Sequence, residues 1–159
     1  MNRRTVTPLL PTTLGPDGIP YARGMQAGDW IYAQGIMATD HVHGLAVPGP
    51  GRANSGQPRR YLEAAGMYAR ALEILQAAGA DFSSVVRTDQ YYPDWRAVPF
   101  LHRARREYCG QYVAPSTSIL EPGLLLPDAG MVMEMIAVRP GGRLSVAPVF
   151  PEGLDLPST

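Results

Sequence analysis

The chain has 159 residues, of which 14 are basic and 14 are acidic, so its formal net charge of zero argues against nucleic acid as its main partner. All 14 basic residues are arginine, and the absence of lysine excludes a Schiff-base lysine and a P-loop lysine. The single cysteine excludes an internal disulfide and an all-cysteine metal cluster. No apolar run approaches the roughly 18 residues of a membrane span, so we expect one cytoplasmic domain over residues 1–159, without membrane contact.

The first part of the chain is predicted to hold an irregular arm followed by two strands. Residues 1–18 are rich in proline, threonine and glycine, which predicts the arm. The segment IPYARGMQAGDWIYAQGIM then predicts two strands around a turn at residues 27–29. Both faces of the second strand carry apolar residues, so we expect it to be covered on both sides.

Two segments lack the periodicity of helices and strands. Residues 41–58 are rich in glycine and proline, and their length suits a mobile flap or an interface arm. His41 and His43 lie in this loop, but no other ligands stand at a suitable spacing, so we predict no metal site. Residues 140–159 have a similar composition and are expected to wrap a surface.

Two amphipathic helices are predicted. The first covers residues 59–78 and ends at Gly79, which is typical of a C-cap. Its apolar spacing predicts a buried face made of Leu62, Ala65, Ala69, Leu72 and Leu75. The second helix follows a strand over residues 85–92, has Pro99 in its first turn, and ends at Gly110.

Two further strands complete the predicted order. Residues 116–120 form one, and residues 130–138 form a nearly all-apolar strand with a single charge, Glu134. Two helices that each link two strands indicate two crossovers on a mixed sheet, with both helices on one face. Because the apolar residues of the last strand point both ways, the uncovered face is expected to meet another copy of the chain in a closed symmetric oligomer.

Four segments resemble the Rid family (reactive intermediate deaminases, also called the YjgF family) in order and approximate spacing. They are PYARGMQAGDWIYAQGIMATD, YARALEILQAAGADFSSVVRTDQYYPD, APSTSIL and MEMIAVRP. The resemblance runs from about residue 19 to residue 139. It implies a chorismate-mutase-like α+β sandwich with a mixed six-stranded sheet, and a homotrimer whose sheets pack inward around three interface clefts. It also implies hydrolysis of imines and enamines to keto acids and ammonia, with no cofactor and no metal.

Two departures from the family pattern affect the expected site. The deaminases of the family read P-A-R-S where this chain reads Val-Ala-Pro-Ser, so Pro115 replaces the arginine that binds a substrate carboxylate. Their E-I-E-A segment aligns with Val132 and Glu134, so the glutamate credited with positioning the water is Val132 here. Proline offers neither charge nor donor, which disfavours a carboxylate at that position. Arg105 or Arg23 could supply a displaced cation, the alternative being ordinary salt-bridge arginines.

Other positions are expected to line the same cleft. Four keep the residue types of the family, namely Tyr21, Gly35, Ser116 and Thr117. Gln34 stands at the pocket serine, and His102 stands at the asparagine of the second helix. Asp89 and Tyr91 share one face of their strand and could also face the ligand, although solvated or interface positions would explain them as well.

Hydrolysis of an imine needs a water, a group that accepts its proton, and stabilised charge on nitrogen. Burial of Glu134 would favour its protonated form and suit it to acid–base work, unless it pairs with an arginine of a neighbouring chain. His102 could transfer protons near neutral pH, or form ordinary surface hydrogen bonds. Tyr21 is a pocket wall and donor or a plain core aromatic. Cys109 has no adjacent base and is not expected to be a nucleophile.

The leading hypothesis is a Rid-like enzyme that acts on a small imine, enamine or related unsaturated compound. The reaction would be hydrolytic deamination, or an isomerisation or cyclisation through an enamine. The alternative is a non-catalytic trimer that binds a small metabolite. Ribonuclease activity is the weakest hypothesis, because the chain is neutral and has no lysine-rich face.

Overall fold

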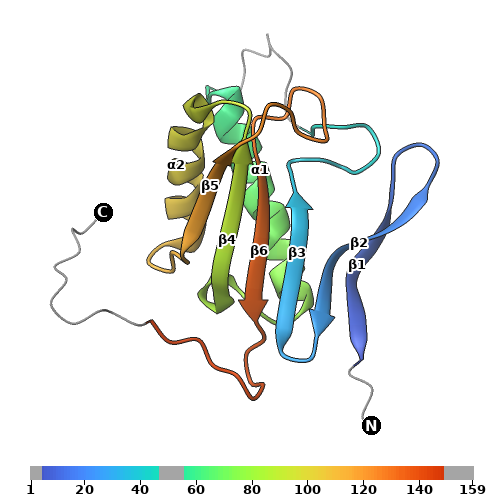
Figure 1. Cartoon of the computed structure of the whole chain (residues 1–159), viewed down its shortest axis with the longest axis vertical. Helices are drawn as coiled ribbons and strands as arrows, with labels where there is room; N and C mark the ends of the chain where they lie inside the picture. Colours follow the sequence, from blue (N-terminus) through green and yellow to red (C-terminus); the bar gives the residue numbers. More distant parts are fainter. Residues whose placement is uncertain (1–4, 47–55, 149–159) are drawn as a thin grey trace, which may run out of the picture.

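A computed structural model describes residues 5–46 and 56–148, and it contains six strands, two α-helices and two short 3₁₀-helices in these ranges (Figure 1). The strands are β1 Val6–Leu14, β2 Ile19–Ala27, β3 Trp30–Ile36, β4 Val85–Tyr92, β5 Ser116–Leu120 and β6 Val132–Val138. The helices are α1 Arg59–Ala77 and α2 Val98–Cys109. None of the described helices is long and apolar enough to cross a membrane.

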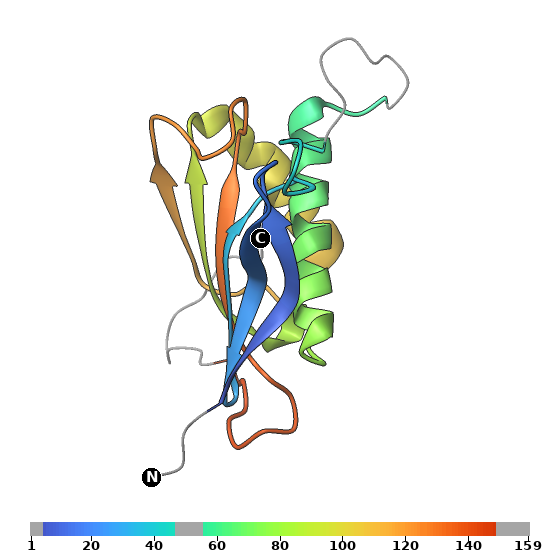
Figure 2. The same cartoon turned by 90° about the vertical axis from the view of Figure 1, so that its right-hand side faces the viewer.

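All six strands belong to one mixed sheet in the order β1-β2-β3-β6-β4-β5. Strands β4 and β5 are parallel, whereas the other neighbouring pairs are antiparallel. Both helices lie on one side of the sheet, and the other side is open (Figure 2). Helix α1 connects β3 to β4 and helix α2 connects β4 to β5, so the expected α+β sandwich with two crossovers is confirmed.

The N-terminal segment is a strand and not the predicted irregular arm. Strand β1 pairs with β2 in a long antiparallel register from Val6 opposite Ala27 to Leu14 opposite Ile19. Leu10 has a positive φ of 47° and is not among the paired residues, but the register is the same on both sides of it. Pro8 and Pro11 are tolerated because β1 is an edge strand that pairs on one side only, which is where sheets accommodate proline.

Helix α1 buries a different face from the predicted one. The residues of α1 that are buried are Glu63, Ala64, Met67, Tyr68, Ala71, Ile74 and Leu75. Of the predicted set only Leu75 is among them, and the other four members are half-buried. In an alanine-rich helix several stripes have similar apolar content, so the larger Met67, Tyr68 and Ile74 decide which face packs on the sheet.

A buried carboxylate fixes the start of α1 against the segment before β6. Glu63 is fully buried and accepts a hydrogen bond of 2.6 Å from the backbone N–H of Gly130. Arg60 donates to the same carboxylate at 2.6 Å and to the carbonyl of Asp128 at 3.0 Å. The side chain of Arg60 also fills the space beside Gly130, where an added Cβ would lie 2.2 Å from a guanidinium nitrogen.

The open face of the sheet carries a row of large apolar side chains on β2, β3 and β6. The burial pattern of β3 places Trp30 and Tyr32 on the side opposite the helices, with 38% and 39% of their surfaces exposed. Tyr32 stands opposite Met25 on one neighbouring strand and opposite Ile136 on the other. In the isolated chain this row of large apolar side chains has no cover from the described residues (Figure 2).

Candidate functional site

One cleft lies where β2 separates from β3 and faces α1, and three of the predicted residues meet there. Tyr21, Gln34 and Gly35 line it together. The hydroxyl of Tyr21 donates to the carbonyl of Gln34 at 3.2 Å. Gly35 has a φ of 62°, a left-handed conformation that favours glycine, and the β3–β6 register shifts at this point. The irregular end of β3 therefore holds open the cleft beside Tyr21.

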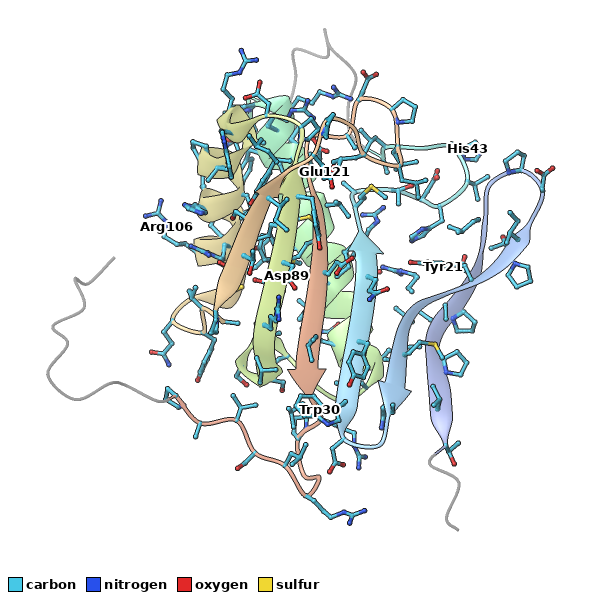
Figure 3. The ribbon with its side chains drawn as sticks, viewed as in Figure 1. Tyr21, Trp30, His43, Asp89, Arg106 and Glu121 are labelled. Atoms are coloured by element: carbon cyan, nitrogen blue, oxygen red, sulfur yellow. The ribbon has the colours of Figure 1, made fainter. Side chains whose placement is uncertain are left out.

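Three basic side chains line the same cleft. Arg23 comes from β2, Arg70 comes from α1, and His41 comes from the turn after β3. The cleft continues between β1 and α1, where it has a volume of about 460 Å³ and also reaches Glu73. Figure 3 shows the Tyr21 side chain between β2 and β3, at the side of the sheet away from β5.

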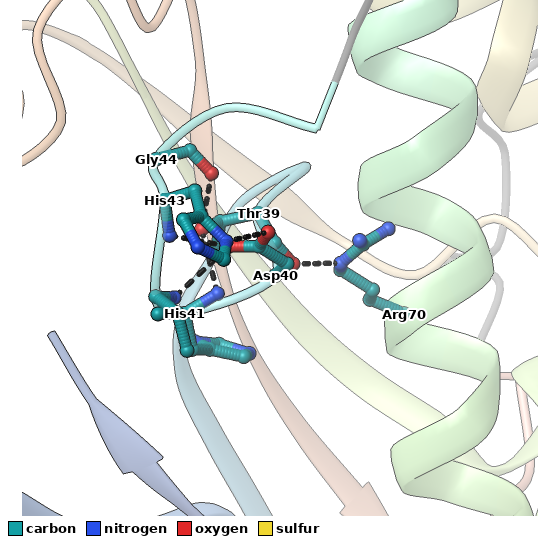
Figure 4. A network of polar contacts seen from close by, with 7 residues as sticks. Thr39, Asp40, His41, His43, Gly44 and Arg70 are labelled. Atoms are coloured by element: carbon teal, nitrogen blue, oxygen red, sulfur yellow. Dashed lines mark hydrogen bonds and ion pairs between the residues drawn. The ribbon is translucent and has the colours of Figure 1, made fainter. Parts of the chain in front are cut away.

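Arg70 binds the turn that carries His41 (Figure 4). Its Nε donates to the carbonyl of Thr39, and its Nη1 donates to the carbonyl of Gly66 at 3.3 Å. The hydroxyl of Thr39 donates to the carbonyl of Gly44 at 2.6 Å and accepts from the N–H of His41 at 2.9 Å. Thr39 and Leu45 also form an isolated bridge, so the start of the predicted loop 41–58 is ordered, while residues 47–55 lie outside the described ranges.

The environment of His41 keeps its imidazole neutral. Burial lowers its pKa, and the charges of Arg23 and Arg70 lower it further. The ring lies 5.6 Å from the ring of Tyr21, and its Nε2 is buried without a hydrogen-bond partner in the described part of the chain. Burial also raises the pKa of Tyr21, against a smaller opposite effect of Arg23, so the phenol stays a proton donor.

His43 does not join His41 in a shared site. It pairs with the carboxylate of Asp40 at 2.9 Å and does not itself line the cleft. Hydrogen bonds from the backbone N–H groups of His43 and Val42 hold the pKa of Asp40 well below its usual range. Within residues 5–46 and 56–148, no group of three His, Cys, Asp or Glu side chains could hold a metal ion.

A second group of predicted residues forms a polar row on the open face of the sheet. Glu134 of β6 stands opposite Asp89 of β4, and Asp89 in turn stands beside Thr117 of β5. Arg87 forms an ion pair of 2.9 Å with Asp89 along the same strand. Tyr91 stands opposite Val132 and beside Ile119, which gives a parallel apolar row. Figure 3 shows Asp89 near the centre of this face.

The hydroxyl residues of β5 divide between the two faces. Ser116 and Ser118 are in register with Thr88 and Gln90, whose side chains point to the helix side, and the Ser118 hydroxyl donates to Gln90 at 3.3 Å. Thr117 alternates to the open face. The exposed Pro115 precedes the strand, and its carbonyl accepts from the N–H of Thr88 at 3.0 Å.

His102 and Arg105 lie on α2, in the helix layer, on the side of the sheet away from Glu134 and Asp89. His102 is exposed, and its pKa is lowered by partial burial and by the charges of Arg105 and Arg106. The Nε of Arg105 is buried without a partner in the described residues. Because the sheet separates α2 from the open face, His102 and Glu134 of one chain cannot act on the same molecule (Figure 2).

The two groups of residues cannot meet within one chain. Strands β2 and β5 are separated by β3, β6 and β4. At about 4.8 Å per strand, Tyr21 and Thr117 therefore lie on the order of 19 Å apart across the sheet. A ligand held by both groups would need a second copy of the chain.

A family model described as endoribonuclease L-PSP matches residues 16–139, more than three quarters of the sequence. The chain belongs to this family. The expected Rid membership is thereby confirmed. A solved structure from Mycobacterium tuberculosis, described as a member of the YjgF/YER057c/UK114 family, has the same fold. It is 20% identical with a TM-score of 0.57, and the match covers 74% of this chain and 86% of that one.

A curated relative agrees with this assignment, and a second solved structure shares the fold. A mouse protein named 2-iminobutanoate/2-iminopropanoate deaminase is 28% identical over 132 residues, which cover 82% of this chain and 90% of the relative. A solved structure from Rhodopseudomonas palustris, described as a probable translation initiation inhibitor, has a TM-score of 0.68 at 23% identity and covers 86% of this chain and 99% of that one. At these identities the two solved structures establish the fold alone.

The cations beside Tyr21 in this L-PSP family member come from β2 and α1, as Arg23 and Arg70. Pro115, at the start of β5, supplies no charge. Sequence reasoning considered Arg23 but missed Arg70. In the sequence, Arg70 was visible only as an arginine in the middle of helix α1, and the buried face of that helix was predicted wrongly.

The thiol of Cys109 in this L-PSP family member is expected to be inert. Cys109 is buried at the end of α2, and this burial raises its pKa to about 11, which keeps the thiol protonated at pH 8. We expect a disulfide reagent at pH 8 to label the folded protein about 100-fold more slowly than the urea-unfolded protein. Equal labelling rates would show that Cys109 is accessible and reactive.

Proposed function

We propose that the protein is a Rid-like enzyme of the cytoplasm that hydrolyses a small imine or enamine in a cleft between the subunits of a homotrimer. The observation that carries the proposal is the division of the site between the Tyr21 side and the Thr117 side of one sheet, next to an uncovered apolar face. Packing of that face against other copies would bring the two sides together. Family membership and the name of the mouse relative support imine chemistry.

The proposed reaction adds water to the carbon of a C=N bond. A base takes one proton of the water while the imine nitrogen gains a proton, which gives a carbinolamine. That intermediate then releases ammonia and leaves a C=O group. An enamine would first be protonated at carbon and enter as the imine.

The side chains suggest roles for three groups. Glu134 is half-buried on the open face and carries a carboxylate that can accept the proton of the water. The hydroxyl of Thr117 can donate a hydrogen bond to nitrogen or oxygen of the ligand, and the phenol of Tyr21 can do so in place of its bond to the carbonyl of Gln34. His102 lies in the helix layer of its own chain, so it would contribute only from a neighbouring subunit.

Replacement of Glu134 by glutamine tests the enzyme hypothesis. We expect the wild type to speed the formation of 2-oxobutanoate and ammonia from 2-iminobutanoate generated in solution. The Glu134→Gln variant should lose about 100-fold or more of this rate, because loss of a general base typically costs that much, while the oligomer stays intact. Glu107→Gln, on the exposed side of α2, is the matched control and should keep the wild-type rate. An unchanged rate in Glu134→Gln would remove Glu134 from the mechanism.

A non-catalytic trimer that binds a small metabolite remains the second hypothesis. It is favoured by the separation of Glu134 from His102, since no acid–base pair forms among the predicted catalytic residues of one chain. A thermal-shift screen with keto acids, imine precursors and aromatic amines separates the hypotheses. Stabilisation by a ligand without any turnover would support the second one.

A further inference from the structure

The cleft beside Tyr21 contains a guanidinium group without a counter-ion. Arg70 is half-buried, yet no carboxylate lies within 4.0 Å of it in residues 5–46 and 56–148. Two of its nitrogens are used by backbone carbonyls, and Nη2 has no hydrogen-bond partner among the described residues. A partly buried guanidinium with a free donor is a strong site for a planar anion.

A second guanidinium stands next to it. Arg23 donates to the backbone carbonyl of Arg70 at 3.5 Å and forms an ion pair with Glu73 at 2.6 Å. The side chain of Arg23 is only 16% exposed, whereas that of Glu73 is 53% exposed. Glu73 is therefore a solvated carboxylate that an incoming anion could displace from Arg23.

Other carboxylates do not neutralise the pair. Asp40 also borders the wider cleft, but it is bound by the backbone N–H groups of Val42 and His43 and by the ring of His43. No acidic side chain lines the inner part of the cleft, next to Tyr21 and His41. The wider cleft, at about 460 Å³, falls within the range of roughly 300–1,000 Å³ that is usual for small-molecule sites.

We infer that Arg70 and Arg23 form the anion-binding part of the site, which takes a small planar carboxylate from the β2–α1 side of the cleft. The part that this site plays in a reaction rests on the proposed function, whereas the binding of a carboxylate does not. All the residues that form this part come from one chain, so a carboxylate should bind whether or not the chain assembles. This chain then differs from relatives with an arginine at the position of Pro115 in where the anion-binding cation lies, since both have such a cation.

Binding of 2-oxobutanoate, a stable carboxylate, tests the inference by calorimetry. We expect the wild type to bind 2-oxobutanoate and to bind its neutral methyl ester at least tenfold more weakly. Arg70→Gln and Arg23→Gln should each weaken binding of the acid about tenfold or more, since each removes a charge-assisted hydrogen bond. Arg96→Gln, an arginine whose side chain is 91% exposed before α2, is the matched control and should change nothing.

One variant should strengthen binding, which a damaged fold cannot imitate. Glu73→Gln removes the carboxylate that competes for Arg23, so the acid should bind severalfold more tightly. The inference is overturned if the wild type does not bind the acid at millimolar concentration, if the ester binds equally well, or if both arginine variants bind like the wild type.

The outcomes separate this inference from the proposed function. Arginine-dependent binding without imine hydrolysis would overturn the function and leave the anion site standing. Imine hydrolysis that is unchanged in both Arg70→Gln and Arg23→Gln would overturn the anion site and leave the function standing.

Discussion

Replacing Tyr32 with glutamate is expected to convert the proposed trimer of 17.2-kDa chains into a monomer and to abolish the proposed imine hydrolysis. Tyr32 lies in the middle of the open face, between Met25 and Ile136 on the neighbouring strands. At 39% exposure the new carboxylate would remain hydrated in a single chain, so the monomer should fold. In the assembly it would be buried without a partner, which costs several kcal/mol per subunit.

The control for this variant is Tyr112→Glu. Tyr112 follows α2 on the helix side and is 53% exposed, so the same chemical change there should leave the trimer intact. Sedimentation or light scattering at micromolar concentration measures the mass of each variant. A Tyr32→Glu protein that stays trimeric would show that subunits do not meet through this face. The monomeric variant should still bind 2-oxobutanoate, because Arg23 and Arg70 belong to one chain.

The second large effect is expected at Glu63. Glu63→Ala should lower the free energy of unfolding by about 3 kcal/mol, because the buried N–H of Gly130 loses its acceptor and Arg60 loses its partner. Glu63→Gln keeps an oxygen for Gly130 and should cost about half as much. Urea unfolding measures both values, and use of the Tyr32→Glu background keeps protein concentration from affecting the result.

The control for Glu63 is Glu107→Gln. Glu107 pairs with Arg103 and Tyr61 on an exposed surface, where such contacts contribute about 1 kcal/mol or less. If Glu63→Ala is no more destabilising than Glu107→Gln, the buried contact to Gly130 does not stabilise the fold.

Most elements of the fold were predictable because their local signals agree with one another. The strands 85–92 and 116–120 have strong strand formers or stop at prolines, and the two glycines after the helices mark where each helix ends. Strand β1 was missed because its prolines and threonines are typical of irregular segments. Only its position at the sheet edge makes them acceptable, and that position is a property of the whole fold.

The orientation of α1 and the composition of the cleft were beyond local signals. From the sequence alone Glu63 is predicted to be a surface residue, because its hydrogen-bond partner Gly130 lies 67 positions away. Arg70 could be placed in the cleft only after the buried face of α1 was known. Tyr21, Gln34 and Gly35 could be grouped by resemblance, but the sequence could not show that the sheet separates them from Ser116 and Thr117.

The two margins of the sheet have a consequence for self-association. At one margin, β1 carries Pro8, Pro11 and the positive φ of Leu10, and these features disfavour pairing with an incoming strand. At the other, β5 is only five residues long and lies between Pro115 and Pro122. Lateral addition of chains, which would grow without limit into fibres, is thus disfavoured at both ends. Contact through the open face of the sheet can instead form a closed oligomer of a few copies, and such an oligomer does not grow further as the protein concentration rises.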